Sequence, residues 1–384
     1  MKKVCVATGS RAEYGLLRPI LKKLNNDNEI DLKIIVTGMH LSPEFGLTVN
    51  EIENDGFKVD FKNEMLLSSD TAQGIVKSMG ICLIGMADYF SYDKPDLLVV
   101  LGDRYEIFSV AASAMIYKIP IAHIHGGEIT EGAYDDSIRH CITKMSTLHF
   151  TSTEEYRRRV IQLGENPDRV FYVGALGVEN IRNQKLMNKH DLEKSIGFEV
   201  DKTTLMVTYH PETLEENNSA EIFKNILYVL NKHKEFRIIF TKANADTDGR
   251  VINRMIDEYV DKHKSNSIAF ESLGLIRYLS VLKYCAAVVG NSSSGIIEVP
   301  SFNIPTINIG DRQKGRIQSN SVINCKADVD EIDEALKLIM KKYTMNKINF
   351  INPYERAGTS DNIIACIKDY LYNRQIVKKI FYDI

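Results

Sequence analysis

The sequence predicts an α/β protein made of two Rossmann-like domains, each with a parallel sheet covered by helices on both faces. Three observations support this fold class. The chain has 384 residues, which is room for two domains at roughly 150 residues each. Short runs that are apolar throughout alternate with longer segments of helical periodicity, as expected for strands buried on both faces. This alternation stops in a polar stretch at 177–200 and then starts again.

The first half of the chain supplies the first domain, residues 1–176. In its first helical segment, Leu17, Ile20 and Leu24 fall on one face, and Pro19 is expected in the first turn, where proline is tolerated. The other segments follow the same alternation. Strands are expected at 4–7, 33–36, 96–103 and 119–127, and helices at 16–24, 71–90, 107–117 and 135–145.

The second half repeats the pattern and supplies the second domain, residues 177–358. Strands are expected at 204–210, 237–242, 286–291 and 305–310, and helices at 219–233, 251–263 and 295–302. The last helical pattern, 360–372, could return to either domain, so the tail 359–384 is a candidate addition to the first one.

Composition excludes several classes of protein. Hydrophobic residues make up 44% and charged residues 26% of the chain, with a net charge of −3, as in an ordinary soluble protein. The lysines are scattered, so no nucleic-acid partner is expected. The six cysteines form no Cys-x-x-Cys pair, which argues against a zinc ribbon or a disulfide framework. The first apolar run is too short for a signal peptide and no segment reaches membrane-spanning length, so we expect a cytoplasmic protein without a membrane partner.

In open parallel sheets, ligands bind beyond the carboxyl ends of the strands, so polar residues that follow a predicted strand are candidates for a binding site. "TGSRAEYG" follows the first strand: Ser10 could cap the next helix, and Arg11 sits where the helix start presents N–H groups to an anion. "LGDRYE" places Asp103 and Arg104 directly after a buried strand. Both stretches could also be ordinary turns.

The serine-rich stretch "GNSSSGIIEVPS" gives a stronger signal. Ser292 and Ser293 lie between a strand and an expected helix, where hydroxyls and backbone N–H groups could bind a pyrophosphate. Glu298, one turn into that helix, could accept hydrogen bonds from ribose hydroxyls. The alternative is a purely structural role, in which the serines cap the helix and Glu298 is an ordinary surface residue. The stretch lacks the Gly-Lys-Ser/Thr of a P-loop, so ATP hydrolysis is not implied.

The stretch "HIHGGEITEGAYDDSIRH" gathers three histidines and several carboxylates. A His-x-His spacing on a strand would put His123 and His125 on the same face, but no third ligand follows at a zinc-type interval, so metal binding is disfavoured. His123 is the better candidate for a buried core histidine. Glu128 and Asp135 remain candidates for chemistry, because helix capping would explain only one of the acidic residues in this stretch.

In the second domain, His210 ends one strand and Asn244 and Asp246 follow the next. If these residues and the serine loop, residues 290–295, face the polar residues of the first domain, the two domains enclose a cleft. Carboxylates on one wall and phosphate donors on the other suit a nucleotide-linked substrate.

Eight motifs, taken in order, resemble a known family. They are "TGSRAEYG", "TGMHLSPEFG", "VLGDRYE", "HIHGGE", "DDSIRH", "HPE", "GNSSSGIIEVPS" and "INIGDRQKGR". Together they look like the hydrolysing UDP-N-acetylglucosamine 2-epimerases of bacterial sialic acid synthesis, most closely the capsule-associated NeuC type, over nearly the whole chain. The resemblance implies a fold of the glycosyltransferase-B kind, with UDP held mainly by the second domain and the sugar facing the first.

The resemblance also implies the reaction and the residues that carry it. UDP-N-acetylglucosamine and water would give N-acetylmannosamine and UDP through a 2-acetamidoglucal, with no cofactor or metal. We also expect a homo-oligomer, a dimer or tetramer. The implied catalytic carboxylates are Asp103 and Asp135, with His210 near the diphosphate. The residues implied for UDP binding and for lining the site are Arg11, Arg104, Asn244, Ser292, Ser293, Glu298 and Arg312.

One departure from the family pattern bears on the chemistry. Some members carry a glutamate where this chain has His125, which leaves open whether His125 or Glu128 takes over its task. A histidine with a pKa near about 6.5 could shuttle a proton at neutral pH.

Three rival functions remain. The first is the same chemistry on UDP-2,4-diacetamido-2,4,6-trideoxyglucose (UDP-N,N'-diacetylbacillosamine), leading to legionaminic acid. The second is a glycosyltransferase of the same fold. The third is a non-catalytic nucleotide-sugar sensor, which the two intact aspartates disfavour.

Overall fold

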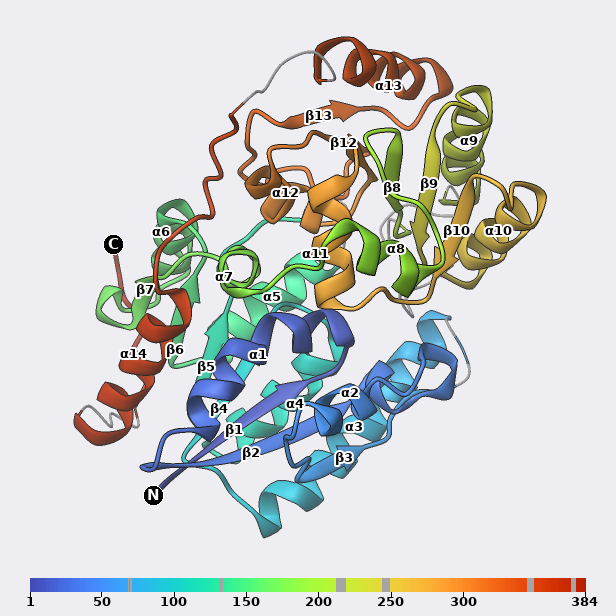
Figure 1. Ribbon diagram of the computed structural model, residues 1–384. Coiled ribbons are helices and arrows are strands. Elements are labelled where there is room, and N and C mark those ends of the chain that lie inside the picture. Colours follow the sequence, from blue (N-terminus) through green and yellow to red (C-terminus); the bar gives the residue numbers. More distant parts are fainter. Residues whose placement is uncertain are drawn as a thin grey trace. The chain divides into compact units, whose positions relative to one another are not determined.

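The computed structural model describes all residues except 68, 70, 131–133, 212–218, 244–248, 344–348 and 374–377 (Figure 1). The chain forms two compact units. Unit 1 comprises Met1–Glu128, Asp135–Asn180 and Tyr354–Ile384, and unit 2 comprises Ile129–Tyr134 and Ile181–Pro353. The last helix, α14 (Thr359–Asn373), therefore belongs to unit 1.

Unit 1 is built on a seven-stranded parallel sheet with the order β3-β2-β1-β4-β5-β6-β7. Its strands are β1 (Lys2–Thr8), β2 (Ile30–Thr37), β3 (Phe61–Asn63), β4 (Leu97–Leu101), β5 (Ile121–Ile124), β6 (Leu148–Thr151) and β7 (Val170–Tyr172). Its other helices are α1 (Arg11–Asn25), η1 (Gly38–Leu41), η2 (Pro43–Phe45), α2 (Val49–Asn54), α3 (Ala72–Tyr92), α4 (Tyr105–Ile116), α5 (Asp135–Met145), α6 (Glu154–Gln162), η3 (Pro167–Arg169) and α7 (Leu176–Asn183), which runs across the boundary into unit 2.

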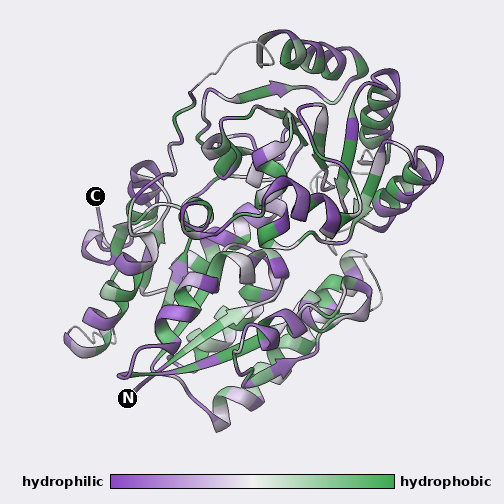
Figure 2. Ribbon diagram, in the orientation of Figure 1, coloured by the Kyte–Doolittle hydropathy of each residue, from purple (hydrophilic) through white to green (hydrophobic). Residues whose placement is uncertain are grey.

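Side chains of successive residues in β1 enter two different cores. Val4 and Val6 join a cluster with residues of α1 and α14, whereas Cys5 and Ala7 join a cluster with residues of α3 and α4. Because consecutive side chains of a strand point to opposite faces, the sheet is covered on both sides, and all its central strands have to be apolar. Figure 2 shows these strands as mostly hydrophobic ribbon.

Unit 2 repeats this plan with a six-stranded parallel sheet in the order β10-β9-β8-β11-β12-β13. Leu205 and Val207 of β8 pack with α9, α10 and α13, and Met206 packs on the opposite face with α8 and α11. Its strands are β8 (Thr204–Thr208), β9 (Arg237–Thr241), β10 (Ser267–Phe270), β11 (Ala287–Gly290), β12 (Thr306–Ile309) and β13 (Val322–Cys325). Its helices are α8 (Lys189–Ile196), α9 (Ser219–Lys232), α10 (Gly249–Lys262), α11 (Leu275–Tyr284), α12 (Ser294–Ile297), η4 (Val299–Phe302) and α13 (Val329–Tyr343).

Each sheet has a point at which its strand order reverses direction along the chain. In unit 1 this point lies between the neighbours β1 and β4, and in unit 2 between β8 and β11. The connections on the two sides of such a point lead away from one another, which leaves a crevice at the carboxyl ends of the strands. These two places are where a ligand of each unit is expected.

The prediction that Pro19 lies in the first turn of its helix was wrong. Helix α1 begins at Arg11, so Pro19 lies in its interior, where its missing N–H leaves the carbonyl four residues earlier without a helical donor. That carbonyl belongs to Gly15, and it accepts a hydrogen bond of 2.9 Å from the buried side-chain amide of Asn180 in α7. A contact from a distant helix thus compensates for the proline.

Within the described ranges, no helix combines the length and apolar composition needed to cross a bilayer.

Candidate functional site

The carboxyl ends of β1 and β4 bring two of the predicted motifs together in unit 1. Strand β1 ends at Thr8 and is followed by the turn that contains Ser10 and Arg11. Strand β4 ends at Leu101 and is followed by Asp103 and Arg104. Because the two strands pair directly, both turns lie at the same point of the sheet edge.

Asp103 is held by a buried arginine that the sequence analysis gave no role. Arg139 of α5 is 1% exposed and its guanidinium forms an ion pair with the Asp103 carboxylate. It also donates to Asp136 at 3.1 Å and to the backbone oxygen of Glu128 at 2.7 Å. A buried guanidinium has to be paired, so Arg139 fixes the position of Asp103 relative to the start of α5. The spacing of three between Asp136 and Arg139 was the one local signal of this arrangement.

Arg104 is oriented by a second buried carboxylate, Glu106. Arg104 donates to the two carboxylate oxygens of Glu106 at 3.2 and 3.3 Å, and its guanidinium lies over the Tyr105 ring at 5.6 Å. Glu106 is 0% exposed, and it packs against the backbone of Gly9 and Gly38. Gly38 has a φ of +59°, and a Cβ there would come within 2.9 Å of Glu106. The position of Arg104 thus depends on close packing of three chain segments.

The first turn of α1 contains a third acidic residue, Glu13, which is 6% exposed. Ser10 caps α1 by accepting from the Glu13 N–H at 3.4 Å, which confirms its predicted role, and Glu13 in return accepts from the Gly9 N–H at 2.7 Å. Burial raises the pKa of Glu13 to about 8, and the neighbouring Glu106 adds to the shift. The turn is therefore fixed by a reciprocal cap built on a buried carboxyl group.

Asp135 begins a helix, as predicted, and Arg11 begins α1, which starts five residues before the helix expected at 16–24. Arg11 is the first residue of α1, and its Nε donates to Glu51 of α2 at 2.8 Å. Asp135 is the first residue of α5 and is half-buried. Their binding and catalytic roles stay predictions.

The two central histidines of the predicted motif differ in environment. His123 lies in β5 and is fully buried; its Nε2 donates to the backbone oxygen of Gly102 at 2.8 Å, and its Nδ1 lies 3.2 Å from the Thr143 hydroxyl. Burial lowers its pKa to about 3, so it is neutral at physiological pH. It is a core histidine, as expected.

His125 does not share a strand face with His123, contrary to the prediction. Strand β5 ends at Ile124, and His125 adopts a φ of +66°, which turns the chain out of the strand. Its Nδ1 lies 3.7 Å from the Glu128 carboxylate, which in turn accepts from the Ser152 hydroxyl at 2.9 Å. Across the described part of the chain, no three His, Cys, Asp or Glu side chains gather as metal ligands would.

The reversal point of unit 2 is organised by Asn291, a fully buried amide at the start of the serine loop. Its side chain accepts from the His210 N–H and donates to the His210 carbonyl, both at 2.8 Å. Its own carbonyl accepts from Arg312 at 3.2 Å and from the buried Gln313 at 2.8 Å. Asn291 therefore links the ends of β8, β11 and β12. Neither Asn291 nor Gln313 was predicted, because only proximity in the fold gives them this role.

The entrance to the serine loop requires glycine. Gly290 has a φ of +133°, and a Cβ at this position would lie 1.9 Å from the backbone oxygen of Thr208. The two strands can approach this closely only without a side chain.

The helix after the serine loop is shorter than predicted. Helix α12 is a single turn, so Glu298 lies at its C-terminal cap, before η4, rather than inside a helix. Ser292 and Ser293 are half-buried. Because a single turn has little dipole, the hydroxyls and backbone N–H groups are the donors that an anion would meet. Asn244 and Asp246 lie outside the described residues.

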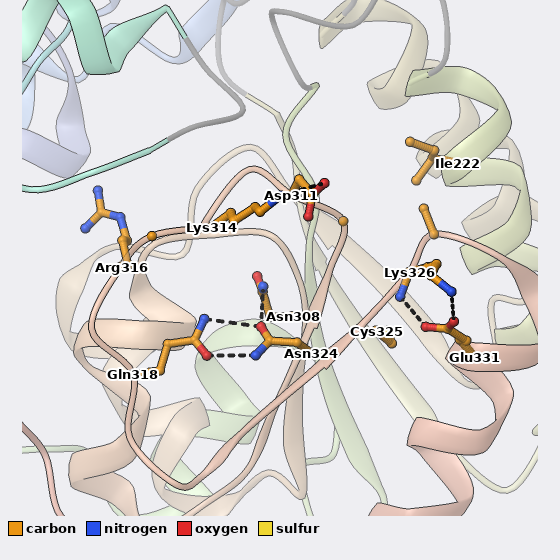
Figure 3. A pocket seen from close by; sticks show the side chains of 13 residues that line it. Ile222, Asn308, Asp311, Lys314, Arg316, Gln318, Asn324, Cys325, Lys326 and Glu331 are labelled. Atoms are coloured by element: carbon orange, nitrogen blue, oxygen red, sulfur yellow. Dashed lines mark hydrogen bonds and ion pairs between the residues drawn. The ribbon is translucent and has the colours of Figure 1, made fainter.

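A cavity of about 580 Å³ lies at the carboxyl ends of β12 and β13, next to the loop that carries Arg312 (Figure 3). One wall is a ladder of amides: Asn308 donates to Asn324 at 2.8 Å, and Asn324 and Gln318 exchange hydrogen bonds of 2.8 and 3.2 Å. Lys314, Arg316 and Lys326 also line the cavity and place cationic groups beside the amides.

Comparison with known proteins gives a consistent picture. The sequence profile described as UDP-N-acetylglucosamine 2-epimerase matches residues 22–368. A Campylobacter jejuni protein, GDP/UDP-N,N'-diacetylbacillosamine 2-epimerase (hydrolyzing), is 44% identical over 370 residues, 96% of each chain. The Escherichia coli polysialic acid biosynthesis protein P7 is 42% identical over 389 residues, 100% of this chain and 98% of that protein. The S. aureus MnaA–UDP co-structure is similar in fold, with a TM-score of 0.79 at 18% identity and 100% of both chains covered.

Proposed function

The chain belongs to the UDP-N-acetylglucosamine 2-epimerase family and is an enzyme that acts on a UDP-sugar, and from this premise we propose its reaction. The protein hydrolyses UDP-N-acetylglucosamine with inversion at C2, releasing N-acetylmannosamine and UDP for sialic acid synthesis. The observation that carries the proposal is the aspartate that Arg139 holds at the edge of the first sheet, at the reversal point where a ligand is expected.

The chemistry explains why carboxylates are needed. The C2 hydrogen is not next to a carbonyl and is poorly acidic, so UDP departure has to run ahead and give C1 oxocarbenium character before a base removes the proton. Anti elimination then gives the 2-acetamidoglucal. Water adds to the glycal with protonation at the other face of C2, which yields the manno product. Each positioned acid or base contributes roughly 100- to 10,000-fold, so more than one is required.

Asp103 and Asp135 divide the acid and base roles in this proposal. Arg139 is a positioning residue, because it binds Asp103 and the backbone oxygen of Glu128. His125 shuttles a proton in place of the glutamate found in other members. Glu128 orients it, since its carboxylate is 2% exposed and lies 3.7 Å from the imidazole.

UDP is proposed to bind unit 2 through its diphosphate and ribose. The serine hydroxyls and nearby N–H groups supply hydrogen bonds, Arg312 supplies charge, and His210 stabilises the leaving diphosphate, with its backbone held by Asn291. Glu298 accepts from the ribose. The remaining proposed UDP ligands are Arg11, Arg104, Asn244, Ser292 and Ser293.

A second candidate substrate has equal support. The 44% identical C. jejuni relative is named for N,N'-diacetylbacillosamine, and the 42% identical E. coli relative for polysialic acid. The same elimination and hydration would act on the diacetamido sugar, because both substrates carry UDP at C1 and an acetamido group at C2.

One experiment separates these candidates from each other and from a glycosyltransferase. The purified protein is incubated in deuterated water with each UDP-sugar, and the sugar is followed by NMR. Free N-acetylmannosamine with deuterium at C2, together with UDP, supports the main proposal. Turnover of the diacetamido substrate alone selects the second candidate. UDP-N-acetylmannosamine, or no turnover of either sugar, rules out the hydrolysing reaction.

A further inference from the structure

Two buried carboxyl groups lie side by side beneath the Arg104 side of the site. Glu106 is 0% and Glu13 is 6% exposed. Both contact Gly9: a Cβ added there would lie 3.2 Å from Glu106 Cβ and 3.6 Å from Glu13 Oε2. Neither residue has a role in the reaction proposed above, so their close approach needs a separate explanation.

The two carboxyl groups have unequal partners. Glu106 accepts two hydrogen bonds from the Arg104 guanidinium, a charge-assisted pair that compensates one negative charge. Glu13 accepts from the Gly9 N–H, and its Oε1 is buried without a hydrogen bond from the described residues. No lysine or arginine in the described ranges forms an ion pair with it. Of the two buried acids, Glu106 therefore has a cationic hydrogen-bond partner, whereas Glu13 has a single backbone donor within the described ranges.

The carboxyl groups of Glu13 and Glu106 are not both ionised in this arrangement. A second carboxylate would be buried next to the first with a single hydrogen bond, and both desolvation and like-charge repulsion oppose its ionisation. The pKa of Glu13, raised to about 8 by burial and then by Glu106, agrees with this conclusion. A neutral carboxyl still accepts from Gly9 and leaves the Arg104–Glu106 pair undisturbed.

We propose that Glu13 keeps a proton in the working enzyme, and that Glu106 is the ionised carboxylate of the pair, which orients Arg104. Glu106 is then a positioning residue for the reaction, and Glu13 is the neutral half of a one-proton pair. The inference rests on the proposed function for its kinetic part. Loss of the proton adds a buried negative charge beneath the turn that contains Arg11, where it competes for Arg104 and repels the diphosphate of the substrate.

The other charged groups around Glu13 do not remove this requirement. Arg11 is paired with Glu51, and Asp103 is a further negative charge on the side of β4. His40 of η1 is fully buried, and burial lowers its pKa to about 4, so it is neutral near pH 7. The charged groups that act on Glu13 are Glu106 of α4 together with Arg104 and Asp103 of the β4–α4 connection, and the nearest charged or titratable groups of α1, α2 and η1 are Arg11, Glu51 and His40.

The proton is tested directly by carboxyl 13C NMR on protein labelled at glutamate Cδ. One resonance should titrate with a midpoint near pH 8 and be missing in Glu13→Gln. Titration of every glutamate in the acidic range overturns the proposal. This readout needs no turnover, so it stays decisive if neither UDP-sugar is a substrate.

Kinetics test the positioning role. Glu13→Gln, which mimics the protonated acid, should keep kcat at pH 7 within about threefold and lose the alkaline decline of the parent enzyme. Glu106→Gln should raise KM about tenfold, because an amide holds a guanidinium less firmly than a carboxylate. Glu53→Gln, which removes an exposed partner of Lys62 in the same unit, is the matched control and should match the parent. An unchanged alkaline decline in Glu13→Gln, with both variants folded by circular dichroism, contradicts the proposal.

Discussion

The reversal points of the two sheets are built from different kinds of side chain. In unit 1 the groups behind the strand ends are charged and paired, as in Asp103 with Arg139 and Arg104 with Glu106. In unit 2 the corresponding group is a neutral amide, Asn291, whose side chain pairs with the His210 backbone and whose carbonyl accepts from Arg312 and Gln313. The same topology therefore supports two chemistries. The paired carboxylates of unit 1 suit proton transfer, whereas the Asn291 amide of unit 2 holds the strand ends without a change of protonation.

The largest effect is expected from a substitution of Asp103, in the charged group at the reversal point of unit 1. Asp103→Asn should lower kcat by roughly 100- to 10,000-fold, because the amide can neither accept nor deliver the proton. UDP affinity, measured by calorimetry, should stay within about twofold, since the proposed UDP ligands do not include Asp103. Asp96→Asn, at the other end of β4, is the control. A parallel loss of UDP affinity would mean that Asp103 binds rather than reacts.

Removing the buried guanidinium of Arg139 should lower the stability of the fold as well as the rate of the reaction. Arg139→Met leaves Asp103 and Asp136 without their shared partner, and breaking a buried ion pair costs about 3–5 kcal/mol. Urea unfolding followed by circular dichroism measures this change. A loss below about 1 kcal/mol would show that the guanidinium is dispensable to the fold.

The buried acid of unit 1 should make stability depend on pH. An unfolded glutamate has a pKa near about 4.3, whereas burial and Glu106 raise that of Glu13 to about 8 in the folded chain. Between these values the folded state keeps a proton that the unfolded state has released. The free energy of unfolding therefore falls as pH rises, by up to about 1.4 kcal/mol per pH unit. Glu13→Gln should remove this slope, so its Tm relative to the parent should rise steadily toward pH 8. A constant difference would argue against the raised pKa.

The smallest effect is expected from a substitution of Asn291, the neutral amide at the reversal point of unit 2. Asn291→Ala removes the side chain that pairs with the buried backbone N–H and carbonyl of His210, which costs about 1–3 kcal/mol. The loss should be independent of pH between about 5 and 8, because no group that titrates there is removed. The same unfolding assay checks this, and a pH-dependent loss would show that the amide acts through a charged neighbour.

The sequence predicted these two places in the fold because the relevant signals are local. A buried strand followed by a glycine-containing polar turn marks the ends of β1, β4 and β11, and the family motifs fall on those turns. Arg139 and Asn291 were missed as hubs, since their partners lie 36 and 81 residues away. Local periodicity contains no information about such contacts. The φ of His125 was missed for another reason, because a non-glycine residue gives no sign that it will leave its strand.

Gly290 restricts which substitutions can be accepted during evolution. The Thr208 oxygen occupies the space that a Cβ would need, so selection should remove every replacement at this position, including alanine. Two positions further on, Ser292 is half-buried, and its hydroxyl accepts from the Ser294 N–H at 3.4 Å. A library that samples all replacements at both sites would therefore separate a position fixed by backbone geometry from one at which the hydrogen-bonding capacity of the side chain matters.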